Sequence, residues 1–153
     1  AGMLSKDYLT QRRALIDWVT EDVAGRLPTY FTIYGNSVAE QSDQVRHAER
    51  AKAAYVILQP PAVGSFAGAE YIRYFGRVAD ATSLPVAIQN APQFLGTGLS
   101  NSALATLNRQ HPNVCMLKGE APASAAVERA TAIARGAEGV VSVDNQLTVK
   151  PKG

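Results

Sequence analysis

The chain has 153 residues, of which 46% are apolar and 18% charged, enough to bury the core of one domain or two small ones. Its 15 basic and 13 acidic residues form no basic stripe, which argues against nucleic-acid binding. Cys115 is the only cysteine, so an intrachain disulfide and a cysteine-rich zinc site are excluded. No apolar run approaches the ~20 residues of a membrane span and no signal segment opens the chain. We therefore expect a cytoplasmic protein without a metal or a cofactor.

From its start to about residue 118, the chain alternates between helical and extended patterns. Ser37 and Glu40 have the spacing of a capping box, and Ser100 is another candidate N-cap. The extended runs are short and apolar without alternation, which is typical of parallel strands covered on both faces. In chain order, the predicted elements are a helix at 5–24, a strand at 29–34, a helix at 37–52, a strand at 55–59, a helix at about 71–79, a strand at 85–89, a helix at 100–111 and a strand at 114–117.

The last thirty residues have a different pattern. Alanine-rich helical spacing over 123–137 is followed by apolar–polar alternation over 141–149, which predicts a half-exposed strand or a tight hairpin. The fold class predicted for the whole chain is α/β, with four parallel strands joined by crossover helices and a C-terminal helix plus one or two strands. A boundary near 121–124 would divide a first unit, 1–122, from a tail, 123–153.

Several short motifs occur at the predicted strand ends. They are Val23-Ala-Gly-Arg-Leu-Pro28, Gln59-Pro-Pro61, Leu84-Pro-Val-Ala-Ile-Gln-Asn-Ala-Pro92, Gly96-Thr-Gly-Leu-Ser100 and Met116-Leu-Lys-Gly-Glu120. In this order and spacing, residues 2 to 122 resemble the middle of the dihydrodipicolinate synthase and N-acetylneuraminate lyase family. These proteins are Schiff-base, pyruvate-dependent aldolases and dehydratases on an α/β barrel. The resemblance implies half of a TIM barrel, strands three to six of eight, and a truncated pyruvate-dependent lyase.

Lys118 is the candidate catalytic residue. It ends an apolar strand, where desolvation favours the neutral amine that attacks a keto carbon, and the resemblance makes it the imine-forming lysine. Gln89 stands where many relatives carry a proton-relaying tyrosine; an amide can hydrogen-bond a substrate oxygen but cannot relay protons. Asn90 and Glu120 are further candidate substrate contacts. A solvent-reaching lysine and an exposed loop carboxylate are the structural alternatives.

The resemblance also implies a missing part. The family holds the pyruvate carboxylate in a Gly-Thr-Thr-Gly-Glu-like loop after the second strand, which would precede Ala1. An alternative is therefore a non-catalytic, recombined or engineered fragment that serves as a folded domain. Because half a barrel exposes sheet edges and an apolar face, a homo-oligomer is expected in either case.

The tail suggests a third possibility. The run from Ala130 to Val149 resembles the second half of a BON domain, a small module of bacterial envelope proteins thought to bind phospholipid. Membrane contact is expected only if this tail works as such a module. Among the remaining residues, His47 and His111 have no partner at catalytic or metal-ligand spacing and are expected at the surface. Cys115 is expected in the core, and Trp18, Tyr30 and Tyr34 in packing roles.

Overall fold

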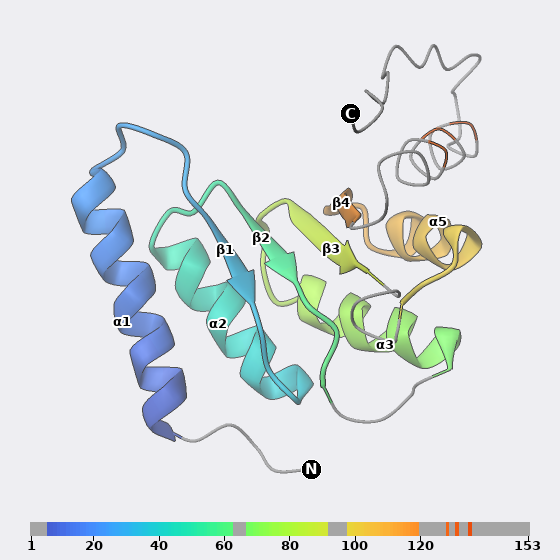
Figure 1. Cartoon of the computed structure of the whole chain (residues 1–153), viewed down its shortest axis with the longest axis horizontal. Helices are drawn as coiled ribbons and strands as arrows, with labels where there is room; N and C mark the ends of the chain where they lie inside the picture. Colours follow the sequence, from blue (N-terminus) through green and yellow to red (C-terminus); the bar gives the residue numbers. More distant parts are fainter. Residues whose placement is uncertain are drawn as a thin grey trace, which may run out of the picture.

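A computed structural model of the chain describes residues 6–62, 67–91 and 98–119, together with Glu128, Thr131 and Arg135. The predicted tail helix and terminal strand fall largely outside these residues. The elements are α1 (Lys6–Val23), β1 (Tyr30–Ile33), α2 (Val38–Arg50), β2 (Tyr55–Leu58), α3 (Gly68–Ala79), β3 (Val86–Asn90), α5 (Asn101–Gln110) and β4 (Val114–Gly119). All four strands are parallel and lie in the order β1-β2-β3-β4 (Figure 1). The α/β prediction and its eight elements are confirmed, with ends shifted by a few residues.

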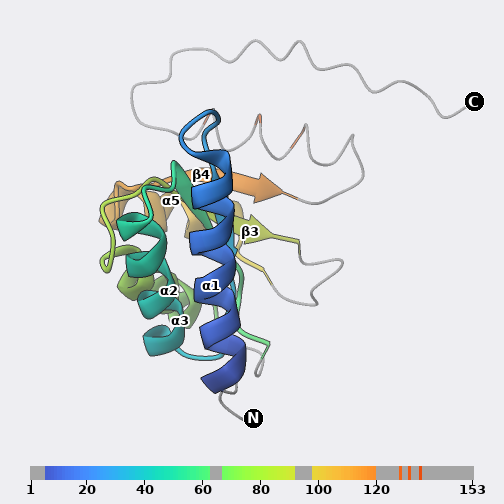
Figure 2. The same cartoon turned by 90° about the vertical axis from the view of Figure 1, so that its left-hand side faces the viewer.

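The core lies between the sheet and the helices. α2, α3 and α5 cover one face of the sheet (Figure 2). The strand side chains on this face belong to one buried apolar cluster, formed by Phe31, Ile33, Val56, Leu58, Val86, Ile88 and Val114. Each such side chain contributes ~1.5–3 kcal/mol when it leaves water, so this layer supplies much of the stability.

No helix of the described ranges covers the other face of the sheet. Since successive strand residues point to opposite faces, this face carries Thr32, Ile57, Ala87 and Met116. Ile57 and Ala87 are buried at its centre, whereas Met116 on the edge strand is 37% exposed. Both faces of the two central strands are therefore buried, as the apolar runs predicted, although only one face lies under helices of these ranges. The apolar central positions fit the inner face of half a barrel instead, where side chains rather than helices fill the space.

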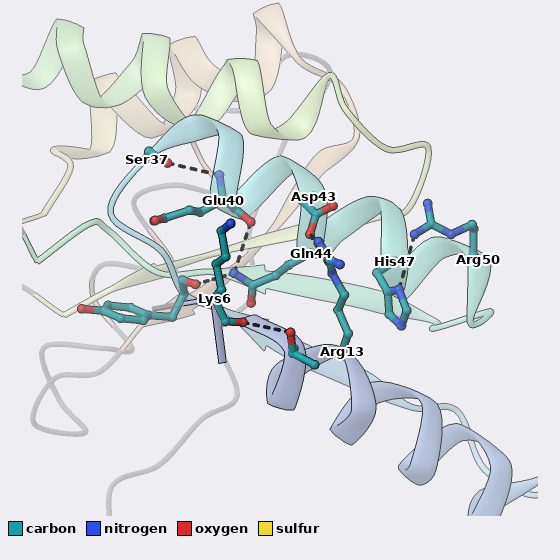
Figure 3. Close-up of polar contacts among 10 residues, drawn as sticks. Lys6, Arg13, Ser37, Glu40, Asp43, Gln44, His47 and Arg50 are labelled. Carbon is teal, nitrogen blue, oxygen red and sulfur yellow. Dashed lines mark hydrogen bonds and ion pairs between the residues drawn. The ribbon is translucent and has the colours of Figure 1, made fainter. Parts of the chain in front are cut away.

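The first helix lies beside β1 and is tied to α2 by charged side chains. Arg13 forms an ion pair with Asp43 (Figure 3), and His47 Nε2 lies 2.7 Å from Asp17 Oδ1. Ile16, between these two positions on the helix, is fully buried. Sequence spacing did not reveal this partner of His47, because Asp17 lies thirty residues earlier in the chain.

α1 also reaches the free edge of β1. The carbonyl of Ile33 accepts from the N–H of Gln59 on the β2 side. Because consecutive carbonyls of a strand point to opposite sides, the Thr32 carbonyl points away from β2, and the Arg12 guanidinium donates to it. A side chain therefore satisfies an edge carbonyl that a neighbouring strand would otherwise take.

The predicted N-caps are observed. Ser37 Oγ accepts from Glu40 N and Ser100 Oγ from Ala103 N, both at 3.2 Å. The Glu40 carboxylate, however, accepts from the backbone N–H of Asn36 at 2.7 Å, one residue before the N-cap. The Glu40 side chain therefore bonds the backbone of the residue before Ser37, not that of Ser37 itself. This bond fixes the turn that leads from β1 into α2.

β4 contains a register shift of the β-bulge kind. Val86 of β3 pairs with Val114, but the next residue, Ala87, pairs with Met116. Cys115 is the additional residue, and it is exposed. The prediction of Cys115 as a core residue is therefore wrong, since simple alternation along the strand does not hold across a bulge.

Candidate functional site

Four polar side chains follow one another across the carboxyl ends of the strands. The registers pair Ile33 with Leu58, Leu58 with Ile88, and Gln89 with Lys118. Continuing them by one residue places Tyr34, Gln59, Gln89 and Lys118 in a single row on the face away from α2, α3 and α5. We call these four residues the strand-end row. In parallel α/β folds, binding and catalytic groups collect at this end of the sheet.

The centre of the row is fixed by a direct hydrogen bond. Gln59 Nε2 donates to Gln89 Oε1 at 2.7 Å. Gln89 is 6% exposed, so its amide is held in a largely dry position between β2 and β4. Strand pairing thus brings the predicted Gln89 beside the predicted Lys118, and adds Gln59 and Tyr34, which sequence reasoning did not propose. Lys118 was predicted because it is a polar residue at the end of an apolar strand, and the same description fits Gln59 and Tyr34.

Lys118 itself is exposed. The desolvated environment expected for it is not found among the described residues, within which β4 is the last strand of the sheet. Its neighbours on the same face are Gln89 across the ladder and Met116 two residues earlier.

Asn90 is placed at the start of the loop that follows β3, where it holds the loop's far end. Asn90 Nδ2 donates to the carbonyl of Leu99 and Asn90 Oδ1 accepts from Leu99 N, both at 2.9 Å. The side chain is 1% exposed and on the helix-facing side of β3, opposite in direction to Gln89. Through these two hydrogen bonds, Asn90 stabilises the chain at Leu99. Its contact with a substrate stays a prediction. Glu120 lies outside the described residues.

Beneath the row, two buried glutamines of α2 secure the loop after β1. Gln41 Nε2 donates to the carbonyls of Gly35 (3.1 Å) and Gln59 (2.8 Å), and Gln44 Nε2 to that of Tyr34 (2.6 Å). Figure 3 shows Gln44 reaching from α2 towards this loop. Backbone groups at a strand end have no ladder partner, so these side chains satisfy carbonyls that would otherwise be buried unpaired.

Tyr74 of α3 reaches the same loop. Its hydroxyl donates to the Gly35 carbonyl at 3.2 Å. Burial, followed by the nearby negative charge of Glu40, raises the pKa of Tyr74 well above its ordinary value of 10.0. The phenol therefore stays a hydrogen-bond donor across the physiological pH range and keeps the loop attached to α3.

A pocket of about 330 Å³ opens at one end of the row. It is lined by Tyr8 and Arg12 of α1, by Thr32 and Tyr34, and by Gln59. Three strand spacings of about 4.8 Å separate Lys118 from Tyr34, roughly 14 Å, so one small keto acid cannot occupy this pocket and reach Lys118 at once. No local sequence pattern predicts this pocket, because the pocket depends on α1 lying beside β1.

His111 Nδ1 lies 2.7 Å from Asp80 Oδ1, a partner that sequence spacing did not reveal. Trp18 is 68% exposed, so the packing role expected for it is not found among the described residues. Tyr30 is 54% exposed, but its ring stacks on that of Tyr55 with the centroids 4.7 Å apart, so its expected packing role is confirmed. The described ranges contain no group of three or more His, Cys, Asp or Glu that could hold a metal. None of their helices is long and apolar enough to cross a bilayer.

Comparison with known proteins gives two separate matches. The chain is 32% identical over 118 residues to an L-2-keto-3-deoxyarabonate dehydratase of Azospirillum brasilense, covering 75% of this chain and 38% of that protein. It is 28% identical over 117 residues to the putative 2-dehydro-3-deoxy-D-gluconate aldolase YagE of Escherichia coli K12, covering 76% and 39%. The chain thus spans about two fifths of the length of these relatives.

Solved structures agree with the sequence relatives. The crystal structure of YagE, described as a dihydrodipicolinic acid synthase family protein in complex with pyruvate, superposes with a TM-score of 0.77 at 26% identity. The superposition covers 84% of this chain and 43% of that one. The four-stranded sheet is therefore a partial barrel, as the resemblance implied. The family model of the BON domain matches residues 112–151, a range that includes β4.

Proposed function

The homologues and structural neighbours of the N-terminal portion are members of the dihydrodipicolinate synthase family, and from this relationship we propose that Lys118 is the imine-forming amine of a 2-keto acid lyase. The observation that carries the proposal is the register that pairs Lys118 with Gln89 at the carboxyl end of adjacent strands. The two relatives are named for 2-keto-3-deoxy sugar acids, and the crystal structure of YagE is a complex with pyruvate. A 2-keto acid is therefore the substrate class proposed here.

In the proposed step, the neutral Lys118 amine attacks the C2 carbonyl of pyruvate. The carbonyl oxygen leaves as water after proton transfer, and the C=N bond of the imine replaces the C=O bond. The protonated imine then accepts the electron pair of an adjacent breaking bond. Gln89, held by Gln59, is oriented to hydrogen-bond a substrate oxygen and cannot shuttle the proton.

Turnover is expected to be slow. The described residues offer no positive group on the inner face next to Lys118 to orient a carboxylate, since Arg12 lies about three strand spacings away. Orientation of a reactant contributes several kcal/mol to a barrier in general. We therefore expect imine formation to persist while carbon–carbon cleavage is weak.

The test is reductive trapping on the full chain. Incubation with pyruvate and borohydride should add the mass of pyruvate less one water plus two hydrogens, and peptide mapping should locate it at Lys118. Lactate, which has no keto carbon, is the matched reagent control. Lys118→Arg should abolish the adduct and Lys6→Arg, at the start of α1, should retain it. A folded chain that gives no adduct at Lys118 would instead support the non-catalytic fragment.

The BON match favours a second candidate function. Because this match covers residues 112–151, we propose the unit 123–153 as a surface- or lipid-binding tail attached to the partial barrel. Co-sedimentation with vesicles containing anionic phospholipid tests it. Binding that disappears when residues after Ser124 are removed supports this function, and an absence of binding by the full chain contradicts it.

A further inference from the structure

We propose that the pocket between α1 and the sheet binds a small hydroxy acid as its carboxylate anion. The pocket lies on the inner face of β1 and β2, the face turned away from α2, α3 and α5. The proposal does not rest on the imine chemistry of Lys118. A hydroxy acid has no keto carbon for an amine to attack, and β1 and β4 lie at opposite ends of the strand order.

Three elements bring the residues of the pocket together. Tyr8 and Arg12 lie one helical turn apart on α1, so they share a flank of that helix. Thr32 and Tyr34 are two residues apart along β1 and therefore point to the same face of the sheet. Gln59, which follows β2, completes the lining. The packing of α1 beside β1 thus encloses a volume of about 330 Å³.

Arg12 supplies a positive charge that has no counter-ion within the described residues. Its Nη2 donates to the carbonyl of Thr32, and its Nε is buried without a hydrogen-bond partner there. No ion pair of the described ranges includes Arg12, whereas the next residue, Arg13, is paired with Asp43. A cation that leaves water is normally paired, because its lost hydration must be replaced. The half-buried guanidinium of Arg12 therefore favours an anion as the occupant of the pocket.

The other lining residues are neutral and can form hydrogen bonds. The hydroxyl of Thr32 makes no hydrogen bond with any residue that the structure describes. The hydroxyl of Tyr34 lies 3.5 Å from Asn36 Oδ1, at the outer limit of a hydrogen bond. No Asp or Glu is among the residues that line the pocket. An anion in it therefore meets one positive charge and hydroxyl donors, with no carboxylate in the lining to repel it.

Gln59 favours a ligand that carries hydroxyl groups as well as a carboxylate. Its Nε2 donates to Gln89 Oε1 at 2.7 Å, which leaves the Oε1 of Gln59 as an acceptor. A carboxylate has no proton to give to an acceptor, whereas a ligand hydroxyl does. We therefore expect the carboxylate beside Arg12 and a hydroxyl beside Gln59.

The size and charge of the pocket restrict the ligand further. One water occupies about 30 Å³ of the liquid, so this volume holds roughly ten non-hydrogen atoms. The planar fork of an arginine matches the two oxygens of a carboxylate. A phosphate monoester carries nearly two negative charges, but Arg12 is the one cationic residue of the lining. The pocket therefore suits hydroxy acids of about three to five carbons.

The test is isothermal titration calorimetry of the full chain with D-glycerate at low ionic strength. Saturable binding of one glycerate per chain is expected. Propionate, which lacks hydroxyls, should bind at least about threefold more weakly, and glycerol, which lacks the carboxylate, at least about tenfold more weakly. Equal affinities for glycerate and propionate would overturn the assignment to hydroxy acids. An absence of saturable glycerate binding would overturn the site itself.

Variants of the lining locate the binding. Arg12→Met removes the charge but keeps an apolar stem, and should weaken glycerate binding at least about tenfold. Arg77→Met, at an exposed position of α3, removes the same charge and should leave the affinity within about twofold. Thr32→Val removes one hydroxyl at nearly unchanged shape and should cost about threefold, so it tests the pocket even where Arg12→Met impairs folding. Glycerate binding that neither Arg12→Met nor Thr32→Val weakens would overturn the proposal.

Lys118→Arg separates this site from the proposed imine chemistry. The variant cannot form the pyruvate adduct, but it should bind glycerate within about twofold of the unaltered chain, because Lys118 is roughly three strand spacings away. Failure of reductive trapping at Lys118 would therefore leave the hydroxy acid site intact. A large loss of glycerate affinity in Lys118→Arg would instead place the acid at Lys118 and overturn a separate site.

Discussion

The imidazole of His111 occupies the space next to Gly76 that a side chain would need. A β-carbon on residue 76 would lie 2.2 Å from His111 Nε2, well inside van der Waals contact. His111 cannot simply move away, because its Nδ1 is held by Asp80 Oδ1 at 2.7 Å. Glycine in the middle of α3 costs about 1 kcal/mol relative to alanine, so the packing of the ring must offset that cost.

Gly76→Ala should therefore destabilise the protein by about 1–3 kcal/mol, despite the better helix propensity of alanine. Urea unfolding followed by circular dichroism measures the change. Gly68→Ala is the matched control in the same helix, since nothing lies within 4 Å of its β-carbon position, and it should be neutral or slightly stabilising. The double variant Gly76→Ala with His111→Ala should recover part of the lost free energy of unfolding, because the ring that clashes is gone. A double variant with no such recovery would contradict the steric explanation.

The Gln59–Gln89 pair should behave as a unit. Gln89→Leu leaves the Gln59 amide without its 2.7 Å partner and should cost about 1–3 kcal/mol of unfolding free energy. The double variant with leucine at both positions removes both polar groups and should be less destabilised than the sum of the two single variants. A double-mutant cycle in urea gives the coupling energy. Strictly additive effects would show that the bond is unimportant in solution.

Asn90 should prove more important to the loop than to the strand. Asn90→Ala removes both hydrogen bonds to Leu99 and leaves a buried N–H and a buried carbonyl unpaired, at a cost of about 2–4 kcal/mol. Limited proteolysis should then cut between residues 91 and 98 faster than in the natural sequence. Asn101→Ala, at an exposed position at the start of α5, is the control and should change stability by only a few tenths of a kcal/mol. Equal cleavage rates in the two variants would argue against the closure of this loop by Asn90.

Tyr74 should make the protein sensitive to alkaline pH. Its pKa is raised in the folded state, so the folded chain retains a proton that the unfolded chain loses above pH 10.0. Stability is thus complete below pH 10.0 and falls as the pH rises beyond it. Tyr74→Phe should lose about 1 kcal/mol at neutral pH, with the bond to Gly35, and show a shallower alkaline decline. Unfolding midpoints between pH 8 and 11 test this; Tyr30→Phe, at an exposed tyrosine, should leave the decline unchanged.

The sequence predicted the elements well because their signals are local. Hydrophobic periodicity and the N-caps Ser37 and Ser100 depend on residues within one or two helical turns. The strand-end rule likewise located Lys118 and Gln89. The features that local patterns did not predict depend on residues far apart in the chain. The aspartates that contact His47 and His111 lie about thirty residues before them. The exposure of Cys115 depends on how β4 pairs with β3. The exposure of Lys118 follows from the place of β4 at the end of the sheet within the described residues, which no local pattern reveals.

The bulge in β4 decides which way the proposed amine faces. Val114 and Leu117 both pack against the core although they are three residues apart, an odd spacing that regular alternation would send to opposite faces. If β4 paired regularly, with Cys115 opposite Ala87, then Lys118 would be opposite Asn90 and would point into the apolar layer beneath α3 and α5. The bulge leaves Cys115 without a place in the ladder, and Lys118 is therefore aligned with Gln89 on the other face. Cys115 is thus a spacer: a strand shortened by this one residue would pair regularly and would still present Lys118 beside Gln89.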